Sequence, residues 1–373
     1  MKILFNNNVL SGLISFRSDV MEHFVKQGHD VIAVTSLNNS TFLSRLPKGV
    51  RYIPVKLEYN KTNPFQDLSY IRQLFSILRR ERPDYVFNYT AKANTYGTML
   101  CKLLHIPSTA MLAGLGYCFI EKNIAARIGL LLHRIALRYS RHVMLLNNEN
   151  VEYVKKIKLF DVKKLIWLQG GEGVSLKKYP FTDNTSDKTT FLFIARLLRD
   201  KGFFEFAEAA KIVKKVSPQT RFLVAGGYSP NLPNSISEQE VKPYTDEHII
   251  EHLGNVSDMQ ALYAQPGIIV AIPSYFSEGL NRSLIEACSC GKPILTTDHP
   301  GCRETLKDGI NGFFVKERDA QSLADAMLKC LNLTQEEKRQ MSLESRKLAK
   351  ERFDVENVIK IYDSIIKQDL AIS

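Results

Sequence analysis

The residues best placed to do chemistry are two glutamates eight positions apart, Glu278 and Glu286. The apolar run 267–272 before Pro273 predicts a strand, and the pattern over 281–290 predicts a helix. One carboxylate then lies in the loop at the strand's end, and the other lies more than one turn inside the helix. The helix N-terminus between them has free N–H groups that suit a phosphate. This arrangement suits a nucleotide-sugar, although two solvated glutamates flanking a helix cap fit the spacing equally well.

A second cluster carries positive charge between a predicted strand and a predicted helix. Arg196 and Lys201 lie in the segment that ends at Gly202. A planar guanidinium and a point charge both suit a diphosphate, and each charge-assisted contact contributes about 1.5–3 kcal/mol. A leaving diphosphate would use both, because its charge grows as the bond breaks. The alternative is a helix-entry loop with solvated basic residues.

Three segments of the first half also follow predicted strands. The loop 6–12 ends at Gly12, where backbone would approach a ligand or turn tightly. It is not a Gly-x-Gly-x-x-Gly fingerprint and lacks the acidic residue expected about 20 positions on, which argues against NAD. Lys92 and Asn94 could bind an acceptor's phosphate or hydroxyls, or Asn94 could simply cap a helix. The segment 113–117 permits close backbone approach or tight packing.

The totals favour an ordinary globular chain of two domains. It has 373 residues, 45% of them apolar and 24% charged. Six cysteines are scattered without a Cys-x-x-Cys pair, so we expect reduced thiols and no metal site. No Asp-x-Asp is present to hold a metal–diphosphate. We therefore expect neither metal nor other cofactor.

Positive charge is concentrated in the first half of the chain. Residues 1–170 contain 24 Lys and Arg against 11 Asp and Glu, whereas the remainder contains 26 against 28. This imbalance favours an anionic partner for the first half, either a membrane surface or nucleic acid. Nucleic acid is the weaker choice, because no basic run is interleaved with aromatics. Solubility is the simpler explanation.

The helical pattern over 124–141 bears on the membrane. It places Arg127, Arg134, Arg138 and Arg141 among apolar residues, as in a helix lying on a membrane surface. The same pattern is typical of a helix that is core on one side and solvated on the other. The chain shows no signal-peptide pattern, and its longest apolar run is far below the ~20 residues of a membrane span. We therefore expect a cytoplasmic protein associated peripherally with the inner face of the plasma membrane.

Short apolar strands alternate with helical patterns along both halves. Strands are predicted at 2–5, 31–35, 52–55, 85–88, 108–112 and 142–146, then at 190–195, 221–225, 249–253, 267–272, 293–297 and 312–315. Helices are predicted at 14–27, 68–81, 94–104 and 124–140, then at 202–215, 257–264, 281–290, 301–306, 319–332 and 335–351. The Gly-rich, then polar segment 170–188 reads as a linker.

This alternation predicts the α/β class, with two tandem doubly wound, Rossmann-like domains. The first domain spans 1–172, with a final helix over 353–371 crossing back onto it, and the second spans 173–352. Ligands of open parallel sheets bind at the carboxyl ends of strands, so we expect a cleft between the domains to hold the site.

Taken together, these motifs resemble those of glycosyltransferase family four, whose members are retaining enzymes of the GT-B fold. The resemblance rests on the glutamate pair, Arg196 with Lys201, Gly12, Gly173-Val174 and Gly291-Lys-Pro293, and it runs the length of the chain. The segments 88–94 and 114–116 are similar to bacterial enzymes that extend polyprenyl-diphosphate-linked sugars, such as α-1,3-N-acetylgalactosaminyltransferases. Two departures are the missing histidine before Gly114 and Ser175 in place of a linker aspartate.

The resemblance implies a role for each matching residue. Arg196 and Lys201 would hold the donor diphosphate, and Glu278 would hold the transferred sugar, which makes these three the catalytic set. The residues that would bind the donor are Gly12, Gly254, Asn255, Val256, Gly279, Leu280, Asn281 and Glu286. The acceptor would meet Lys92, Asn94, Gly116 and Tyr117.

The function so implied is transfer of a sugar from a UDP donor to a polyprenyl-diphosphate-linked glycan, with retained configuration and without metal. N-acetylgalactosamine is the favoured sugar, in surface polysaccharide or glycan assembly. The expected partners are the nucleotide-sugar, the lipid-linked acceptor and an anionic membrane surface, but no nucleic acid. Two alternatives are a nucleotide-sugar epimerase of the same fold and a non-catalytic subunit that binds lipid or nucleotide.

Overall fold

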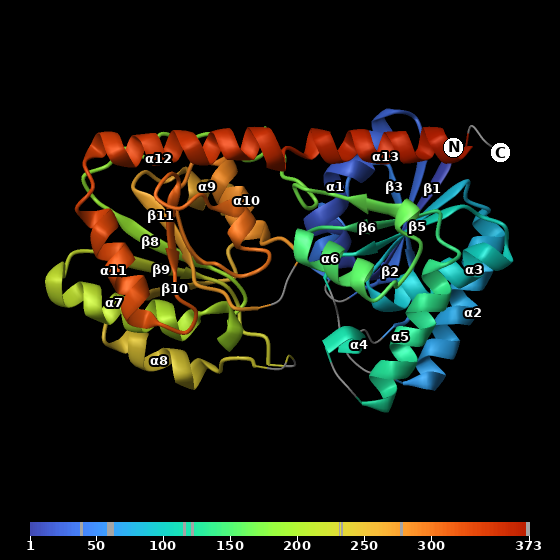
Figure 1. The fold of residues 1–373 in the computed structure, drawn as a ribbon, viewed down its shortest axis with the longest axis horizontal. Helices are drawn as coiled ribbons and strands as arrows, with labels where there is room; N and C mark the ends of the chain where they lie inside the picture. The colour runs from blue at the N-terminus through green and yellow to red at the C-terminus, as the bar shows by residue number, and fades with distance from the viewer. Residues whose placement is uncertain are drawn as a thin grey trace. The chain divides into compact units, whose positions relative to one another are not determined.

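The computed structural model describes residues 1–37, 40–57, 63–114, 117–120, 123–230, 232, 234–276 and 279–370. The chain divides into two compact units. The first consists of Met1–Gly173 with Val355–Ser373, and the second of Val174–Asp354. Each is an α/β domain with its own parallel sheet, which confirms the predicted fold class (Figure 1).

The first unit contains a seven-stranded sheet in the order β3-β2-β1-β4-β5-β6-β7, with every neighbouring pair parallel. Its strands are β1 (Lys2–Val9), β2 (Asp30–Ser36), β3 (Val50–Pro54), β4 (Tyr85–Tyr89), β5 (Ser108–Leu112), β6 (His142–Leu145) and β7 (Leu165–Trp167). Its α-helices are α1 (Leu10–Lys26), α2 (Pro64–Glu81), α3 (Thr98–Leu103), α4 (Tyr117–Ile120), α5 (Ile124–Leu137), α6 (Asn148–Lys156) and α13 (Val355–Leu370). A π-helical turn, Ala93–Gly97, leads into α3.

Alternating side chains of these strands bury both faces of the sheet, as parallel sheets require. Phe5 and Phe87 pack on one face in a core shared with α1 and α13. Leu4 and Val86 point to the other face, against α2 and α3. The same face continues over β5 and β6 into a core shared with α6. The C-terminal helix is thus part of the first unit's core.

The second unit contains a six-stranded parallel sheet in the order β10-β9-β8-β11-β12-β13. Its strands are β8 (Thr190–Ile194), β9 (Arg221–Ala225), β10 (Glu251–Gly254), β11 (Ile268–Ile272), β12 (Ile294–Thr297) and β13 (Gly312–Val315). Its α-helices are α7 (Phe203–Val216), α8 (Glu238–Asp246), α9 (Met259–Ala264), α10 (Arg282–Ser289), α11 (Ala320–Leu331) and α12 (Gln335–Leu348). Helices α7, α8 and α11 cover one face of the sheet, whereas α9 and α10 cover the other.

The structure corrects several predicted elements. The predicted polar loop 6–12 is wrong, because β1 runs to Val9 and α1 begins at the next residue. Asn6 stays in the strand because its side chain donates to Asn88 Oδ1 (2.8 Å) and accepts from the Tyr70 hydroxyl (2.9 Å). The prediction missed β7, α6 and α8. The predicted helix at 301–306 is only a 3₁₀ turn, Arg303–Thr305.

Two further observations concern the whole described chain. No helix in the described ranges is long and apolar enough to cross a membrane. All six cysteines carry free thiols, and five of them are buried.

Candidate functional site

The candidate site of the second unit lies where four neighbouring strands end. β10, β9, β8 and β11 are adjacent and parallel, so their carboxyl ends share one edge of the sheet. Arg196 follows β8, Gly226 and Gly227 follow β9, Gly254 ends β10, and the loop 273–276 follows β11. Ligands of such sheets bind at this edge.

The loop after β8 is locked to the loop after β11. The Tyr275 N–H donates to the carbonyl of Asp200 (2.9 Å), and its hydroxyl donates to the carbonyl of Arg199 (2.9 Å). Gly202 has a φ of +84°, and a Cβ added there would lie 2.4 Å from the carbonyl oxygen of Pro273. Only glycine allows this turn and this close approach together.

The three cations of this loop lie in different environments. Lys201 is 7% exposed, and its Nζ lies 4.5 Å from the centroid of the Phe276 ring. Arg196 is exposed and forms no ion pair with any described residue. Nearby Arg199 differs, because its guanidinium pairs with Glu240. Arg196 is thus the guanidinium of this loop that is available to an anionic ligand.

Gly254 leaves open space at the end of β10. Its φ is +64°, and an added Cβ there would meet no atom within 4 Å. Its carbonyl accepts from the N–H of Gly226 (2.8 Å), which ties the ends of β9 and β10 together. Asn255 packs its amide against Gly227, and Val256 is partly buried. The backbone at Gly254 is therefore accessible to a flat ligand group.

The residues 279–281 lead into α10 on the same side. Gly279 and Leu280 are buried, and Asn281 is the N-cap, whose side chain accepts from the Leu284 N–H (3.2 Å). The N–H of Asn281 donates to the carbonyl of Gly301 (2.8 Å). This N-terminus carries the partial positive charge of the helix dipole.

Glu286 is held by neighbours rather than free. It is 8% exposed, and Arg282, one turn earlier on α10, donates its Nε–H to Oε1 at 2.7 Å. Burial, and the adjacent Glu286 carboxylate, raise the pKa of the Tyr179 hydroxyl well above its usual range. Its neighbours thus fix the Glu286 carboxylate as an oriented acceptor.

In the first unit, the predicted site residues Gly12 and Lys92 are engaged in contacts with other residues of that unit. Gly12 lies in the first turn of α1, where its carbonyl accepts from Arg17 Nη1 (3.2 Å). Lys92 pairs with Asp67 at 2.7 Å, and the Tyr96 hydroxyl donates to the other oxygen of that carboxylate at 2.8 Å. Lys92 is therefore held in place by a carboxylate that an acceptor phosphate would have to displace.

Asn94 is 1% exposed and braces β5. Its Nδ2 donates to the carbonyl of Met111 (2.7 Å), and its Oδ1 accepts from the Met111 N–H (3.2 Å). Both ends of the amide are used by the backbone, so we leave Asn94 out of the acceptor contacts proposed below. Glu278, Gly116 and the side chain of Tyr117 lie outside the described residues.

The sequence analysis overlooked two aromatic residues at the candidate site. The Phe276 ring contacts Lys201. Its position in the sequence between Pro273 and Glu278 could have indicated that it belongs to the site. Tyr228 packs edge-to-face on His252, with ring centroids 5.3 Å apart, just beyond the end of β9. The Gly226-Gly227 pair directly before Tyr228 could have indicated a ligand-binding turn at the end of a strand.

Among the described residues, no group of three or more His, Cys, Asp or Glu side chains is placed to hold a metal ion. The loop after β8 contributes three cations, Arg196, Arg199 and Lys201, and one carboxylate, Asp200. The described side chains there can bind an anion through Arg196 and Lys201 and orient hydroxyl groups through Glu286.

Family profiles cover most of the chain. The family described as "Glycosyl transferases group 1" matches residues 177–348, and the one described as "Glycosyl transferase 4-like" matches residues 2–148. The chain therefore belongs to the glycosyltransferases, with a 4-like domain in its first unit and a group 1 domain in its second. It is an enzyme of this class.

Curated relatives with known names are similar over much of their length. An N,N'-diacetylbacillosaminyl-diphospho-undecaprenol α-1,3-N-acetylgalactosaminyltransferase of Campylobacter jejuni is 26% identical over 98% of this chain and all of its own. The capsular polysaccharide biosynthesis glycosyltransferase CapM of Staphylococcus aureus is 23% identical over 72% of each chain.

Solved structures show the same fold. A glycosyltransferase from Rickettsia africae superimposes with a TM-score of 0.80 at 20% identity, covering 100% of this chain and 99% of its own. Anabaena HepE in complex with UDP gives a TM-score of 0.75 at 17% identity, covering 99% of this chain and all of its own. These likenesses establish the GT-B fold.

Proposed function

We propose that this glycosyltransferase moves a sugar from a UDP donor to a polyprenyl-diphosphate-linked glycan, with the anomeric configuration retained. The observation that carries the donor site is the loop after β8, where Arg196 is exposed and pairs with no described carboxylate, and where Lys201 is buried against Phe276. A diphosphate is the nucleotide-sugar group that such a pair recognises.

In this proposal each group of the donor has its own partners on the chain. Arg196 and Lys201 take the diphosphate, whose charge grows as the bond from sugar C1 to phosphate oxygen breaks. The open backbone at Gly254 accommodates the base, and Asn255 and Val256 flank it. Glu286, oriented by Arg282, accepts hydrogen bonds from the ribose hydroxyls. Glu278 and the backbone of residues 279–281 hold the transferred sugar.

In this proposal the enzyme uses no metal and no cofactor. The bond from C1 to the diphosphate breaks, C1 bonds to the acceptor hydroxyl on the same face, and the hydroxyl proton leaves with UDP. The two cations at the leaving group supply the stabilisation that a divalent ion gives in other phosphate chemistry.

The relatives support the choice of donor and acceptor. The C. jejuni relative is named for N-acetylgalactosamine transfer to a sugar on diphospho-undecaprenol, and HepE was solved with UDP. We therefore favour N-acetylgalactosamine on UDP, used in surface polysaccharide or glycan assembly. We keep Lys92 as an acceptor contact because it lies three residues after the end of β4, and the acceptor phosphate would then replace Asp67 as its partner.

The first unit also offers a surface for a membrane. On α5, Ile124 (77% exposed), Ile128 (54%) and Leu131 (57%) lie one helical turn apart and form an outward apolar ridge. Arg127 is exposed beside it, whereas Arg134 turns inward to donate to the carbonyl of Ile157 (3.1 Å). An apolar ridge with an adjacent cation suits the surface of an anionic bilayer. We propose peripheral association with the inner face of the plasma membrane.

The donor site is tested by calorimetric titration of UDP, GDP and ADP in the presence of chelator. UDP should bind, and Glu286→Gln should weaken its binding at least tenfold, because ribose hydroxyls lose a charged acceptor. Glu208→Gln is the matched control, since Glu208 also accepts from a tyrosine, Tyr244 (2.7 Å), and pairs with a lysine. Absence of nucleotide binding, or equal losses in both variants, would refute the donor site.

Transfer itself is tested with UDP-N-acetylgalactosamine and a lipid-diphosphate-linked acceptor, followed by NMR of the new glycosidic linkage. An α product from the α donor supports retention, and a β product refutes it. Product formation that needs no acceptor would favour an epimerase.

The membrane proposal has its own test, co-sedimentation with vesicles. Binding should require phosphatidylglycerol and fall in an Ile128→Ser, Leu131→Ser double variant. Leu343→Ser, at an exposed leucine of the second unit, is the control. Unchanged sedimentation of the double variant would refute the α5 surface.

A further inference from the structure

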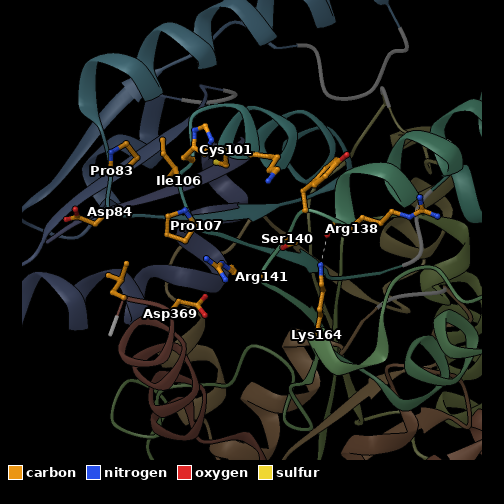
Figure 2. Close-up of a pocket in the computed structure, with 14 residues that line it drawn as sticks. Pro83, Asp84, Cys101, Ile106, Pro107, Arg138, Ser140, Arg141, Lys164 and Asp369 are labelled. Carbon is orange, nitrogen blue, oxygen red and sulfur yellow. Dashed lines mark hydrogen bonds between the residues drawn. The ribbon is translucent and has the colours of Figure 1, made fainter. Parts of the chain in front are cut away.

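A concave surface lies at the edge of the first sheet that is opposite to the carboxyl ends of its strands. It is a pocket of about 800 Å³ that crosses the amino ends of β4, β5, β6 and β7 and reaches the end of α13. Figure 2 shows residues from the turns before each of these strands around it. A strand of five residues spans about 17 Å, so this pocket is separate from the carboxyl edge of the same sheet.

The lining of this pocket is rich in positive charge. It contains Lys102, Arg138, Arg141 and Lys164 against two carboxylates, Asp84 and Asp369. Arg141 and Lys164 lie toward the middle of the pocket in Figure 2, on either side of Ser140, whereas Arg138 reaches to one side. Among the described residues, none of the four cations forms an ion pair.

The two carboxylates are held by other groups. Asp84 accepts from the backbone N–H of Lys2 (2.7 Å). Asp369 is 8% exposed and accepts from the Tyr85 hydroxyl (2.6 Å) and from His142 (3.2 Å). Asp369 lies within electrostatic reach of Arg141, but its oxygens face these two partners. The excess positive charge therefore stays on the pocket's surface.

The nearby cations affect the pKa of Lys164. Burial lowers the pKa of its ammonium, Asp161 opposes that change, and the neighbouring Arg141 lowers the pKa further. Its Nζ donates to the carbonyl of Arg138 (2.5 Å), which caps the end of α5 but leaves the charge of Arg141 unmatched. An anion with more than one negative charge would relieve this repulsion.

We propose that this pocket binds a small phosphorylated anion through Arg141 and Lys164, with Lys102 and Arg138 as further cations of the lining. Arginine and lysine together are the usual ligands of phosphate oxygens. The ligand would bridge the ends of α3 and α5 and the turns before β6 and β7. The shared chemistry is a phosphate group, free in solution or on a lipid headgroup.

The test titrates inorganic pyrophosphate into the full chain with UDP present, so that any donor site is already filled. The Kd should rise at least tenfold in an Arg141→Gln, Lys164→Gln double variant. It should change less than twofold in Arg72→Gln, Lys163→Gln, which removes the same charge from exposed residues of the same unit. Pyrophosphate should also raise the Tm of the wild type and of the control, but not of the pocket variant.

Vesicles distinguish the source of the phosphate. If the pocket variant loses phosphatidylglycerol binding while pyrophosphate does not bind the wild type, the ligand is a headgroup. If pyrophosphate binds, the ligand is a free anion. The proposal would be overturned if the wild type bound neither pyrophosphate nor vesicles, or if the pocket and control variants lost binding equally. It would also be overturned if the pocket variant had a lower Tm but pyrophosphate still raised that Tm as much as in the wild type. The last outcome would leave the cations as caps of helix ends alone. Because UDP binding is measured separately, failure of this site does not affect the donor site.

Discussion

Lys201 lies over the ring of Phe276, with Nζ 4.5 Å from the ring centroid, and so joins the loop after β8 to the loop after β11. Lys201 is buried, and cation–π contacts of desolvated cations contribute about 2 kcal/mol. The ring therefore positions a cation that belongs to the proposed leaving-group site.

Replacing Phe276 by leucine should lower kcat/KM about tenfold, because Lys201 loses the ring that orients it. Phe204→Leu is the control, since the Phe204 ring contacts another cation of the same unit. The Cζ atom of Arg199 lies 5.2 Å from the centroid of that ring. Steady-state kinetics with UDP-sugar measures both. Equal effects would show that the ring under Lys201 has no special role.

Arg196→Ala should lower kcat by about 10²–10³, as loss of one charge-stabilising donor does in other enzymes. Arg199→Ala should leave kcat nearly unchanged, because Arg199 is exposed and paired with Glu240. Turnover of Arg196→Ala within tenfold of the wild type would remove Arg196 from the leaving-group site.

Gly254→Ala should weaken UDP binding about tenfold, since the new methyl group would enter the open space proposed for the base. Gly309→Ala is a close control, because its φ is +71° and an added Cβ also meets nothing within 4 Å. Both substitutions should cost about 1 kcal/mol of stability from left-handed backbone. Calorimetry and denaturant unfolding separate the two effects, and equal UDP affinities would contradict the prediction.

Arg17 and Glu172 form a buried ion pair in the first unit, and the guanidinium also lies 4.3 Å from the centroid of Tyr89. Arg17→Met alone should lower the free energy of unfolding by about 3–5 kcal/mol, because Glu172 would remain buried without its cation. Glu172→Met added to it should restore part of the loss. A double-mutant cycle in urea measures the coupling, and strict additivity would show that the pair is not coupled.

Lys292 is fully buried, and burial lowers its pKa to about 8. Its Nζ donates to Asn184 Oδ1 (2.9 Å) and to the carbonyl of Gln265 (3.1 Å). Above pH 8 the unfolded chain holds this proton while the folded chain releases it, so the contribution of Lys292 to stability rises with pH.

The difference in unfolding free energy between the wild type and Lys292→Met should therefore increase by about 2 kcal/mol from pH 8 to pH 10. The exposed Lys350→Met serves as the control and should show no such slope. A flat difference for Lys292→Met would mean that its pKa is not lowered.

The sequence by itself determined the fold class and most of the elements. Short apolar runs alternating with helical patterns predict parallel sheets covered on both faces, and both sheets have that form. It also placed Arg196 and Lys201 directly after a strand end, where parallel sheets bind ligands. These conclusions follow from local patterns that one stretch of chain contains completely.

Only the tertiary structure decided which polar residues are exposed. Asn6 and Asn94 are polar residues of the kind that line binding loops, yet both are buried inside the first unit. Asn6 donates to Asn88, and Asn94 donates to the carbonyl of Met111. Arg196 and Arg199 lie in the same loop, but Glu240 on α8 pairs with Arg199, whereas no described carboxylate pairs with Arg196. Hydrogen bonds and ion pairs between distant segments depend on the packing of whole elements, so no local pattern reveals them.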